Sequence, residues 1–447
     1  MFTFANRHFS LSSTLTIGFV AVILFGALLL TLPIATVHGI ESSFIIALFT
    51  STSATCVTGL TLVETSTYWS FFGQFVIMML SEIGGLGFMT FMVLMFTSAR
   101  RKLRLSTQLL AQESLNLQHL SQVKLVKMIV GLSLGIQTVG AILLFFNFYP
   151  KFGLFKGIWY SIFHSVSAFC NAGFSLFGNS IAAFKDNTYI LTVLGILIMC
   201  GSVGFLVWRD VLTYHKRHHL SLHTKLSLRT GFVIFIGSIF LYALTENGFN
   251  NISHNTSTFH KIINIIFMAI TPRTAGLVTF DYTHLSMAGT FLTMILMFIG
   301  GTPGSTAGGV KSTTIGLLAV QTWATLRGHH DVNFSNRRFP RENIYRALTL
   351  IVVAFLIVSV ATFVLCMTQP LAEKMGLEYI IFEVLAAFGT TGISLGLTVH
   401  LTLFGKIVIM LMMFIGRVGI FNVMYTVLNA KNDQSDIRYP EESVLIG

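Results

Sequence analysis

Long apolar runs separated by short polar loops dominate the chain, and they alternate with apolar segments of about half that length. Eight runs approach the roughly 20 residues that a membrane-spanning helix requires. They are centred near residues 24, 85, 137, 199, 237, 298, 357 and 415. Four shorter segments, too short to cross a bilayer, occupy residues 42–54, 158–169, 260–270 and 378–388. Each short segment lies between two long runs and ends in a polar, Gly-containing stretch. The pattern predicts re-entrant loops, because non-helical backbone at membrane depth must be buried in protein or line a watery cavity.

The four short segments end in related sequences, each with a small or hydroxyl residue, then glycine, then an apolar residue. The glycines are Gly59, Gly173, Gly276 and Gly392. Their spacings of 114, 103 and 116 residues are each close to a quarter of the 447-residue chain. A second glycine follows each of them after 24 to 28 residues, and these are Gly84, Gly201, Gly300 and Gly416. Two markers with nearly constant offsets indicate an internal repeat.

We therefore expect an all-α polytopic membrane protein with four tandem helix–pore loop–helix repeats in a pseudo-fourfold arrangement and eight transmembrane helices. The expected boundaries are residues 1–105 for repeat 1, 106–222 for repeat 2, 223–340 for repeat 3 and 341–430 for repeat 4. Repeat 3 is expected to have a broken inner helix. Residues 431–447 are expected to form a cytoplasmic C-terminal tail.

Composition and charge agree with a membrane protein. Only 10% of the residues are charged and 53% are hydrophobic, whereas soluble domains are about 25% charged. The net charge of +11 comes mainly from short loops between apolar runs, so we attribute it to membrane orientation rather than to nucleic-acid binding. Of the 28 Lys and Arg residues, 19 fall on the side of the two chain ends. This bias predicts cytoplasmic termini and loops that enter from outside.

The glycine loops have the chemistry of a cation filter. If four units surround one axis, the helix before each loop directs its negative C-terminal end toward that axis. Glycine allows successive carbonyl oxygens to face the axis without a Cβ clash. A ring of such oxygens can replace the hydration shell of a cation. No catalytic group is required, and no HExxH or GxSxG motif occurs, so we expect no enzyme.

A family resemblance rests on specific motifs. They are Val57-Thr58-Gly59-Leu60, Asn171-Ala172-Gly173-Phe174, Pro272-Arg273-Thr274-Ala275-Gly276, Thr391-Gly392, the Gly-rich break after Phe298, and the tail motif from Ile437 to Glu442. Through them the whole chain resembles the membrane subunit of Ktr-type potassium uptake systems, in the Trk/Ktr/HKT superfamily. The resemblance implies potassium as the substrate and these segments as its filter. The implied filter residues are Val57, Thr58, Gly59, Asn171, Ala172, Gly173, Thr274, Ala275, Gly276, Thr390, Thr391 and Gly392.

The resemblance also implies partners and a location. It implies a homodimer in which each subunit keeps its own pore, with the C-terminal tail in the contact. A cytosolic nucleotide-binding regulatory ring of RCK-type subunits would dock on the basic loops. The implied location is the plasma membrane of a bacterium, with the lipid bilayer around the chain. We expect no resident cofactor and no metal beyond the permeating potassium ion, with sodium as a candidate modulator.

A glycine-rich stretch interrupts the sixth apolar run. Pro303 and five glycines fall within residues 300–309, and neither residue type continues a helix without cost. A phosphate-binding loop is excluded because Val310 separates the last glycine from the lysine. We expect a mobile gate beneath the filter, and a kinked packing region is the alternative. The expected gate residues are Gly300, Gly301, Thr302, Pro303, Gly304, Ser305, Thr306, Ala307, Gly308, Gly309, Lys311 and Arg417.

Charged residues inside apolar runs require a partner or water. We interpret Arg417 as a pore-facing charge that raises the energy of a passing cation. The alternative is an arginine satisfied by backbone carbonyls. For Lys311 the inner cavity and the cytoplasmic interface both remain open. Glu82 and Glu383 are expected to pair with arginine or to accept hydrogen bonds from the loop backbone.

One competing function remains. An ion-coupled secondary transporter with alternating access would also contain broken helices. That class usually shows a two-fold repeat with one site, whereas this chain shows four equivalent glycine loops.

Overall fold

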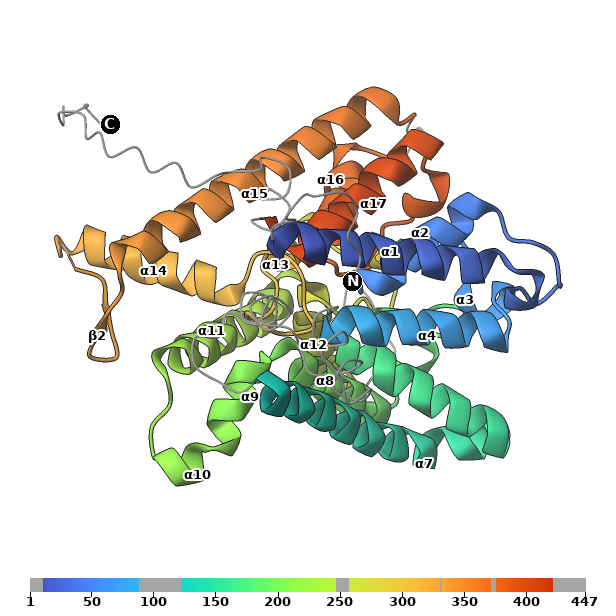
Figure 1. Cartoon of the computed structure of the whole chain (residues 1–447), viewed down its shortest axis with the longest axis horizontal. Helices are drawn as coiled ribbons and strands as arrows, with labels where there is room; N and C mark the ends of the chain where they lie inside the picture. The colour runs from blue at the N-terminus through green and yellow to red at the C-terminus, as the bar shows by residue number, and fades with distance from the viewer. Residues whose placement is uncertain (1–10, 88–121, 247–256, 330, 371–374, 421–447) are drawn as a thin grey trace, which may run out of the picture.

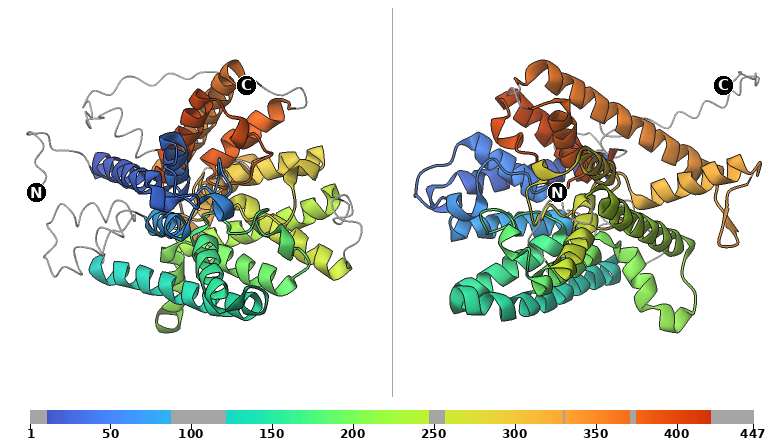
Figure 2. Two further views of the ribbon diagram at one scale, coloured as in Figure 1. Left: turned by 90° about the vertical axis from the view of Figure 1, so that its right-hand side faces the viewer. Right: turned by 180° about the vertical axis from the view of Figure 1, so that it is seen from behind.

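The structure is a computed structural model, and it describes residues 11–87, 122–246, 257–329, 331–370 and 375–420 (Figure 1). Within these ranges the regular secondary structure is helical apart from one small hairpin, and loops connect the helices. In the left view of Figure 2 the helices follow one another around a common centre in the order of the chain. The predicted tail (residues 431–447) and the predicted boundary between repeats 1 and 2, at residues 105 and 106, lie outside the described residues.

The first half of the chain contains eight helices and two 3-10 turns within the described residues. They are α1 (Leu11–Thr31), η1 (Pro33–Ala35), α2 (Phe44–Thr55), α3 (Thr65–Tyr68), α4 (Phe71–Leu86), α7 (Gln122–Cys170), η2 (Ala182–Phe184), α8 (Thr188–Ser202), α9 (Phe205–Leu212) and α10 (Tyr214–Arg217). The described second half adds α11 (Leu222–Thr245), α12 (Thr258–Ile270), η3 (Thr271–Arg273), η4 (Tyr282–His284), α13 (Met287–Phe298), α14 (Ser312–Leu326), α15 (Arg341–Thr368), α16 (Leu377–Phe388), η5 (Thr398–His400) and α17 (Leu403–Val418). The hairpin pairs β1 (Asn333–Phe334) with β2 (Arg337–Arg338).

The four segments predicted to be too short to span a bilayer are short helices. Three of them are α2, α12 and α16, with 12, 13 and 12 residues. The fourth is the C-terminal part of α7, because Gly153 has non-helical φ and ψ of 77° and −178° that divide that long helix. Each short helix leads directly into one of the predicted glycine motifs. The prediction of their positions is confirmed.

Several of the long helices are suited to a bilayer. Val126–Cys170, Leu222–Thr245 and Arg341–Thr368 are long and apolar enough to cross it, and α8 with α9 forms a further candidate bent by 97°. Phe146, Phe232 and Phe355 on these helices are each about two-thirds exposed, as expected for side chains that face lipid. The expected total of eight spans stays a prediction, because the residues that follow α4 and α17 are not described.

The inner helix of repeat 3 is interrupted as predicted, since α13 ends at Phe298 and α14 begins at Ser312. The structure adds that the other three inner helices also end or bend close to the second glycine marker. α4 ends before Gly87 with φ 84°, and α17 ends before Gly419 with φ 93°. α8 bends sharply into α9. Positive φ at a glycine ends a helix without the steric penalty that other residues meet.

The second glycine marker has a packing reason. A Cβ added to Gly84 would collide with the carbonyl oxygen of Thr55, at the end of α2. The corresponding collision at Gly416 would be with the carbonyl oxygen of Phe388, at the end of α16. In repeats 1, 2 and 4 the marker therefore allows the inner helix to approach the C-terminal end of a short helix closely, whereas Gly300 in repeat 3 lies against the carbonyl oxygen of Gly308.

Candidate functional site

The four glycines of the first marker lie in contact, although more than 100 residues separate each from the next. A Cβ added to Gly59 would lie 2.8 Å from the Cα atom of Gly173, and one added to Gly276 would lie 3.0 Å from the same atom. A Cβ added to Gly392 would lie 3.0 Å from the Cα atom of Gly59. The circle is closed between Gly276 and the fourth segment, because a Cβ on Gly276 would lie 2.5 Å from the oxygen of Thr391, next to Gly392. We call the four glycines the glycine ring, and we call the four predicted filter segments that end in them the ring segments. The structure thus brings together the centres of all four predicted filter segments.

Carbonyl oxygens lie against the glycine ring. They belong to the residues just before each glycine, which are Thr58, Ala172, Ala275 and Thr391. A Cβ on Gly59 would lie 2.6 Å from the Ala172 oxygen, and one on Gly276 would lie 2.5 Å from the Thr391 oxygen. No real Cβ approaches backbone so closely, and all four glycines also have φ between 69° and 90°. Only glycine fits these four positions without strain or displacement of the backbone.

Three of the short helices reach the ring through the same turn. In the first, Thr58 N–H donates to the Ser53 carbonyl at 2.8 Å and Val57 N–H donates to the Ala54 carbonyl at 3.1 Å. This is a Schellman motif, which usually has glycine at its left-handed residue. Here that residue is Val57, and at the second and fourth helices it is Asn171 and Thr390, with φ of 57°, 59° and 52°.

These left-handed residues are strained, because the conformation costs about 1–2 kcal/mol for a residue with a Cβ. Strain of this kind persists where the surrounding structure fixes the backbone, and it is concentrated at functional sites. Valine and threonine are β-branched, which makes Val57 and Thr390 more unusual than Asn171.

The third segment reaches the ring by another route. Pro272 lies in the 3-10 turn η3, and Thr274 has an extended φ of −179°. Ala275 N–H donates to the Thr271 carbonyl at 2.9 Å instead of forming the Schellman pair. The ring of glycines is therefore complete, although one of its four turns differs from the others.

Polar side chains brace the ring from behind. Ser394 donates to Glu383 at 2.7 Å, and Thr398 donates to the other carboxylate oxygen. At the same distance in sequence before its ring glycine, nine residues, His164 accepts from Leu176 N–H at 3.2 Å. His164 was missed in the sequence analysis, and this shared offset from the ring glycine is the signal that could have identified it.

The expected partners of the two membrane carboxylates were wrong in detail. Glu383 bonds hydroxyl side chains of its own loop rather than an arginine or the loop backbone. Glu82 accepts from Gln137 at 2.8 Å and from the Cys170 thiol at 3.0 Å. Both carboxylates are therefore held by neutral side chains. The sequence could not specify the partners of Glu82, because they lie 55 and 88 residues away on segments that only tertiary packing brings together.

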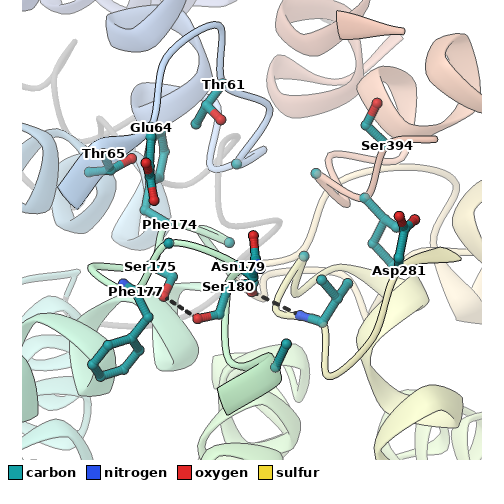
Figure 3. A pocket seen from close by; sticks show the side chains of 18 of the residues that line it. Thr61, Glu64, Thr65, Phe174, Ser175, Phe177, Asn179, Ser180, Asp281 and Ser394 are labelled. Carbon is teal, nitrogen blue, oxygen red and sulfur yellow. Dashed lines mark hydrogen bonds between the residues drawn. The ribbon is translucent and has the colours of Figure 1, made fainter. Parts of the chain in front are cut away.

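A cavity of about 620 Å³ opens on one side of the ring, and all four ring glycines contribute to its lining (Figure 3). Its charged lining residues are Glu64 and Asp281, which Figure 3 shows on opposite sides of the pocket. No lysine or arginine contributes to the lining. A concave site that contains only acidic charges raises the local concentration of cations.

The predicted gate stretch passes against the other side of the ring segments. We call residues 299–311 the crossing loop, whose two ends are joined by a bridge between Ile299 and Val310. Thr302 and Thr306 donate their N–H groups to the carbonyls of Ser202 and Gly201, each at 3.2 Å. The loop also contacts two filter segments, through Asn171 and Thr390.

Arg417 connects the crossing loop to the first inner helix. Its guanidinium donates to the Thr306 carbonyl and to the carbonyls of Gly84 and Gly85, the last at 2.9 Å. The contacts match the alternative of an arginine satisfied by carbonyls, and they place its charge against the crossing loop. Lys311 donates to the Ala307 carbonyl of the same loop at 2.6 Å.

An oxygen-lined ring between an acidic cavity and a crossing loop, in an apolar helical fold, is typical of proteins that pass cations. The chain matches the TrkH family, described as cation transport protein, over residues 8–436. It is 46% identical over 432 residues to the potassium/sodium uptake protein NtpJ of Enterococcus hirae, with 96% of each chain covered. It is 38% identical over 443 residues to the Ktr system potassium uptake protein B of Bacillus subtilis, covering 98% of this chain and 97% of that one.

A solved structure supports the fold. The potassium transporter TrkH from Vibrio parahaemolyticus aligns with a TM-score of 0.71 at 18% identity, over 96% of this chain and 86% of that chain. The chain therefore belongs to the TrkH family, and it is a transport protein rather than an enzyme. The resemblance to the membrane subunits of Ktr and Trk systems is confirmed.

Proposed function

We propose that the chain takes up potassium across the plasma membrane through the glycine ring. The observation that carries this proposal is the closed ring of four glycines faced by carbonyl oxygens. Carbonyl oxygens replace the water shell of potassium in known filters. The names of the two relatives, a potassium/sodium uptake protein and a potassium uptake protein, support the same ion.

The surrounding groups favour a cation throughout its path. Glu64 and Asp281 attract it into the cavity. The short helices then direct their negative C-terminal ends toward the ring. In this proposal the four ring segments are quasi-equivalent parts of four helix–pore loop–helix repeats with eight transmembrane helices. The filter residues are those of the four predicted segments.

The crossing loop is the proposed gate. It lies on the side of the ring away from the acidic cavity, where it would obstruct an ion that has passed the glycines. Arg417 holds it through the Thr306 carbonyl and adds a positive charge close to the path. Opening requires the loop to leave these contacts while the ring stays in place.

Regulation and assembly complete the proposal. A separate cytosolic ring of RCK-type, nucleotide-binding subunits would control the loop, and two copies of this chain would form a homodimer. The N and C termini would be cytoplasmic, in a bacterial plasma membrane. Sodium is proposed as a modulator, in line with the potassium/sodium name of one relative.

Complementation of a potassium-uptake-deficient bacterium tests the proposed activity. We expect the chain to restore growth at low potassium, and Gly59→Ser to lower the preference for potassium over sodium, because a Cβ there meets the Ala172 oxygen. Absence of potassium uptake by protein that is present in the membrane would overturn the proposal. Flux with a fixed coupling ratio to a second ion would favour the secondary transporter instead.

Deletion of residues 304–309 tests the gate separately. We expect potassium flux to rise, because the obstructing segment is removed while the ring residues remain. Unchanged or abolished flux in a membrane-inserted deletion variant would contradict gating and leave the filter proposal standing.

A further inference from the structure

Two side chains of the ring segments hold the crossing loop directly. Asn171 Nδ2 donates to Thr306 Oγ1 at 2.7 Å, in a fully buried position. In the fourth segment, Thr390 Oγ1 accepts from Gly308 N–H at 3.1 Å, and it is also buried. The second and fourth glycines are not neighbours in the ring, so these two attachments lie on opposite sides of it.

Both residues occupy the same place in their segments, two positions before the ring glycine. They are also two of the three residues that adopt the left-handed conformation at the end of a short helix. The next residue in each segment, Ala172 or Thr391, supplies a ring carbonyl oxygen. A change in the backbone at Asn171 or Thr390 therefore moves an oxygen that faces the ring.

The other two segments clarify the pattern. The equivalent residue of the first segment is Val57, whose side chain has no hydrogen-bonding group. The equivalent residue of the third is Thr274, whose hydroxyl lies 3.2 Å from Ser202 Oγ. Ser202 in turn accepts from Asn171 Nδ2 at 3.3 Å. The crossing loop is thus bonded to two ring segments and linked to a third through Ser202.

We propose that Asn171 and Thr390 form a latch that couples the gate to the ion preference of the ring. This inference rests on the proposed filter and gate. When the crossing loop leaves, two strained residues lose the bonds that help to fix them, and the adjacent ring oxygens gain freedom to move. The coupling is reciprocal, so an ion that orders the ring also favours the closed loop. Both are positioning residues.

Isosteric substitutions at two separate sites test the latch. Thr390→Val removes the hydroxyl but keeps the β-branched shape, and Thr390→Ser keeps the hydroxyl. Thr306→Val and Thr306→Ser form the same pair on the loop side. Potassium flux and potassium-to-sodium preference are measured on the full chain in reconstituted vesicles, at equal amounts of inserted protein. Thr390 and Thr306 take part in different hydrogen bonds of the latch. If a variant at one of these positions fails to insert into the membrane, the variants at the other position still test the proposal.

We expect Thr390→Val to raise potassium flux about fivefold, since one neutral hydrogen bond shifts a two-state population by roughly that factor. Thr306→Val should raise the flux at least as much, because the Thr306 hydroxyl also donates to the Phe169 carbonyl at 3.2 Å. We also expect the potassium-to-sodium preference to fall about two- to threefold. The serine variants should stay near the wild type. The matched control is Ser305→Ala, because the Ser305 hydroxyl accepts from Ala307 N–H inside the loop rather than from a ring segment.

The potassium-to-sodium preference of Thr306→Val decides whether the loop and the ring are coupled, because Thr306 is not one of the proposed filter residues. Higher flux with unchanged preference would show that the loop and ring act independently, and it would overturn the coupling. Unchanged flux in both valine variants would overturn the latch but leave the gate intact, provided that deletion of residues 304–309 raises flux. If that deletion also has no effect, the proposed gate itself fails.

Discussion

The glycine ring and the crossing loop are both glycine-rich backbone inside an apolar fold, yet they are held in opposite ways. A Cβ on Gly59 or Gly276 would lie within 2.6 Å of a backbone oxygen, whereas one on Gly304, in the crossing loop, has no other atom within 4 Å. Backbone atoms of the neighbouring segments confine each ring glycine. Hydrogen bonds hold the loop instead, from the side chains of Asn171, Thr390 and Arg417 and between its backbone and that of Gly201 and Ser202.

The glycine ring must therefore keep its geometry, whereas the crossing loop is able to move away from the ring. A backbone collision cannot be relieved by rotation of a side chain, so any substitution in the ring must displace backbone that carries the ring oxygens. A neutral hydrogen bond contributes only about 1 kcal/mol net, so a few such bonds allow the loop to be released. Substitutions in the two regions should therefore have different directions as well as different sizes.

The largest effect is expected at the ring. Gly392→Ala places a Cβ against the Thr58 oxygen, so potassium uptake should fall at least about a hundredfold, equivalent to roughly 3 kcal/mol. Gly396→Ala is the matched control, because Gly396 has a φ of 95° but no atom within 4 Å of an added Cβ. Uptake assays in the deficient bacterium compare the two. Normal uptake by Gly392→Ala would show that the ring is not confined.

The next effect is expected at Arg417. Arg417→Ser removes the bonds from α17 to the Thr306 carbonyl and to α4, so potassium flux should rise about tenfold. Arg417→Lys keeps the charge but not the planar group that reaches several carbonyls. If its flux equals that of the wild type, the charge rather than the bonding restrains the ion. Lower flux in Arg417→Ser at normal expression would indicate a structural role.

A smaller effect is expected behind the ring. Glu383→Gln replaces one of the two carboxylate oxygens with an NH2 group, so one of the Ser394 and Thr398 hydroxyl groups loses its acceptor, which should lower the free energy of unfolding by about 1–2 kcal/mol. Thermal unfolding of the purified protein measures this. Glu378→Gln, at an exposed position in the first turn of α16, is the control. Equal unfolding temperatures in both variants would show that the bracing bonds contribute nothing.

The smallest effect is expected at the tip of the loop. Gly304→Ala meets no neighbouring atom and adds only the strain of a φ of 69°. That strain is about 1 kcal/mol, so flux should stay within about fivefold of the wild type. Flux measurements in vesicles test this. A loss of flux as large as that of Gly392→Ala would remove the contrast between the two regions.

The short helices show which structural features the sequence patterns predict and which they do not. Their positions followed from the contrast between apolar runs of two lengths, and their glycines followed from the repeat. The third turn did not follow, because its Pro272 and extended Thr274 replace a Schellman motif while the glycine that follows is unchanged. A motif indicated which residue must approach its neighbours. It did not indicate the path by which the chain reaches that residue.

Partners were less predictable than positions. The second glycine marker was recognised, but the ends and bends of three inner helices at that marker were not expected. Arg417 was recognised as unusual, but its carbonyl partners lie 111, 332 and 333 residues away in the chain. His164 was missed because a single histidine in an apolar segment gives no sign of the loop that it braces.

The sequence by itself determined the helical membrane character, the four short helices and the four glycines, because hydrophobic periodicity and repeats are local properties of the chain. The tertiary structure alone decided that these glycines close into one ring and that the crossing loop is bonded to two of its segments. Such contacts join residues that are distant in the chain, and their geometry depends on how all the helices pack at once.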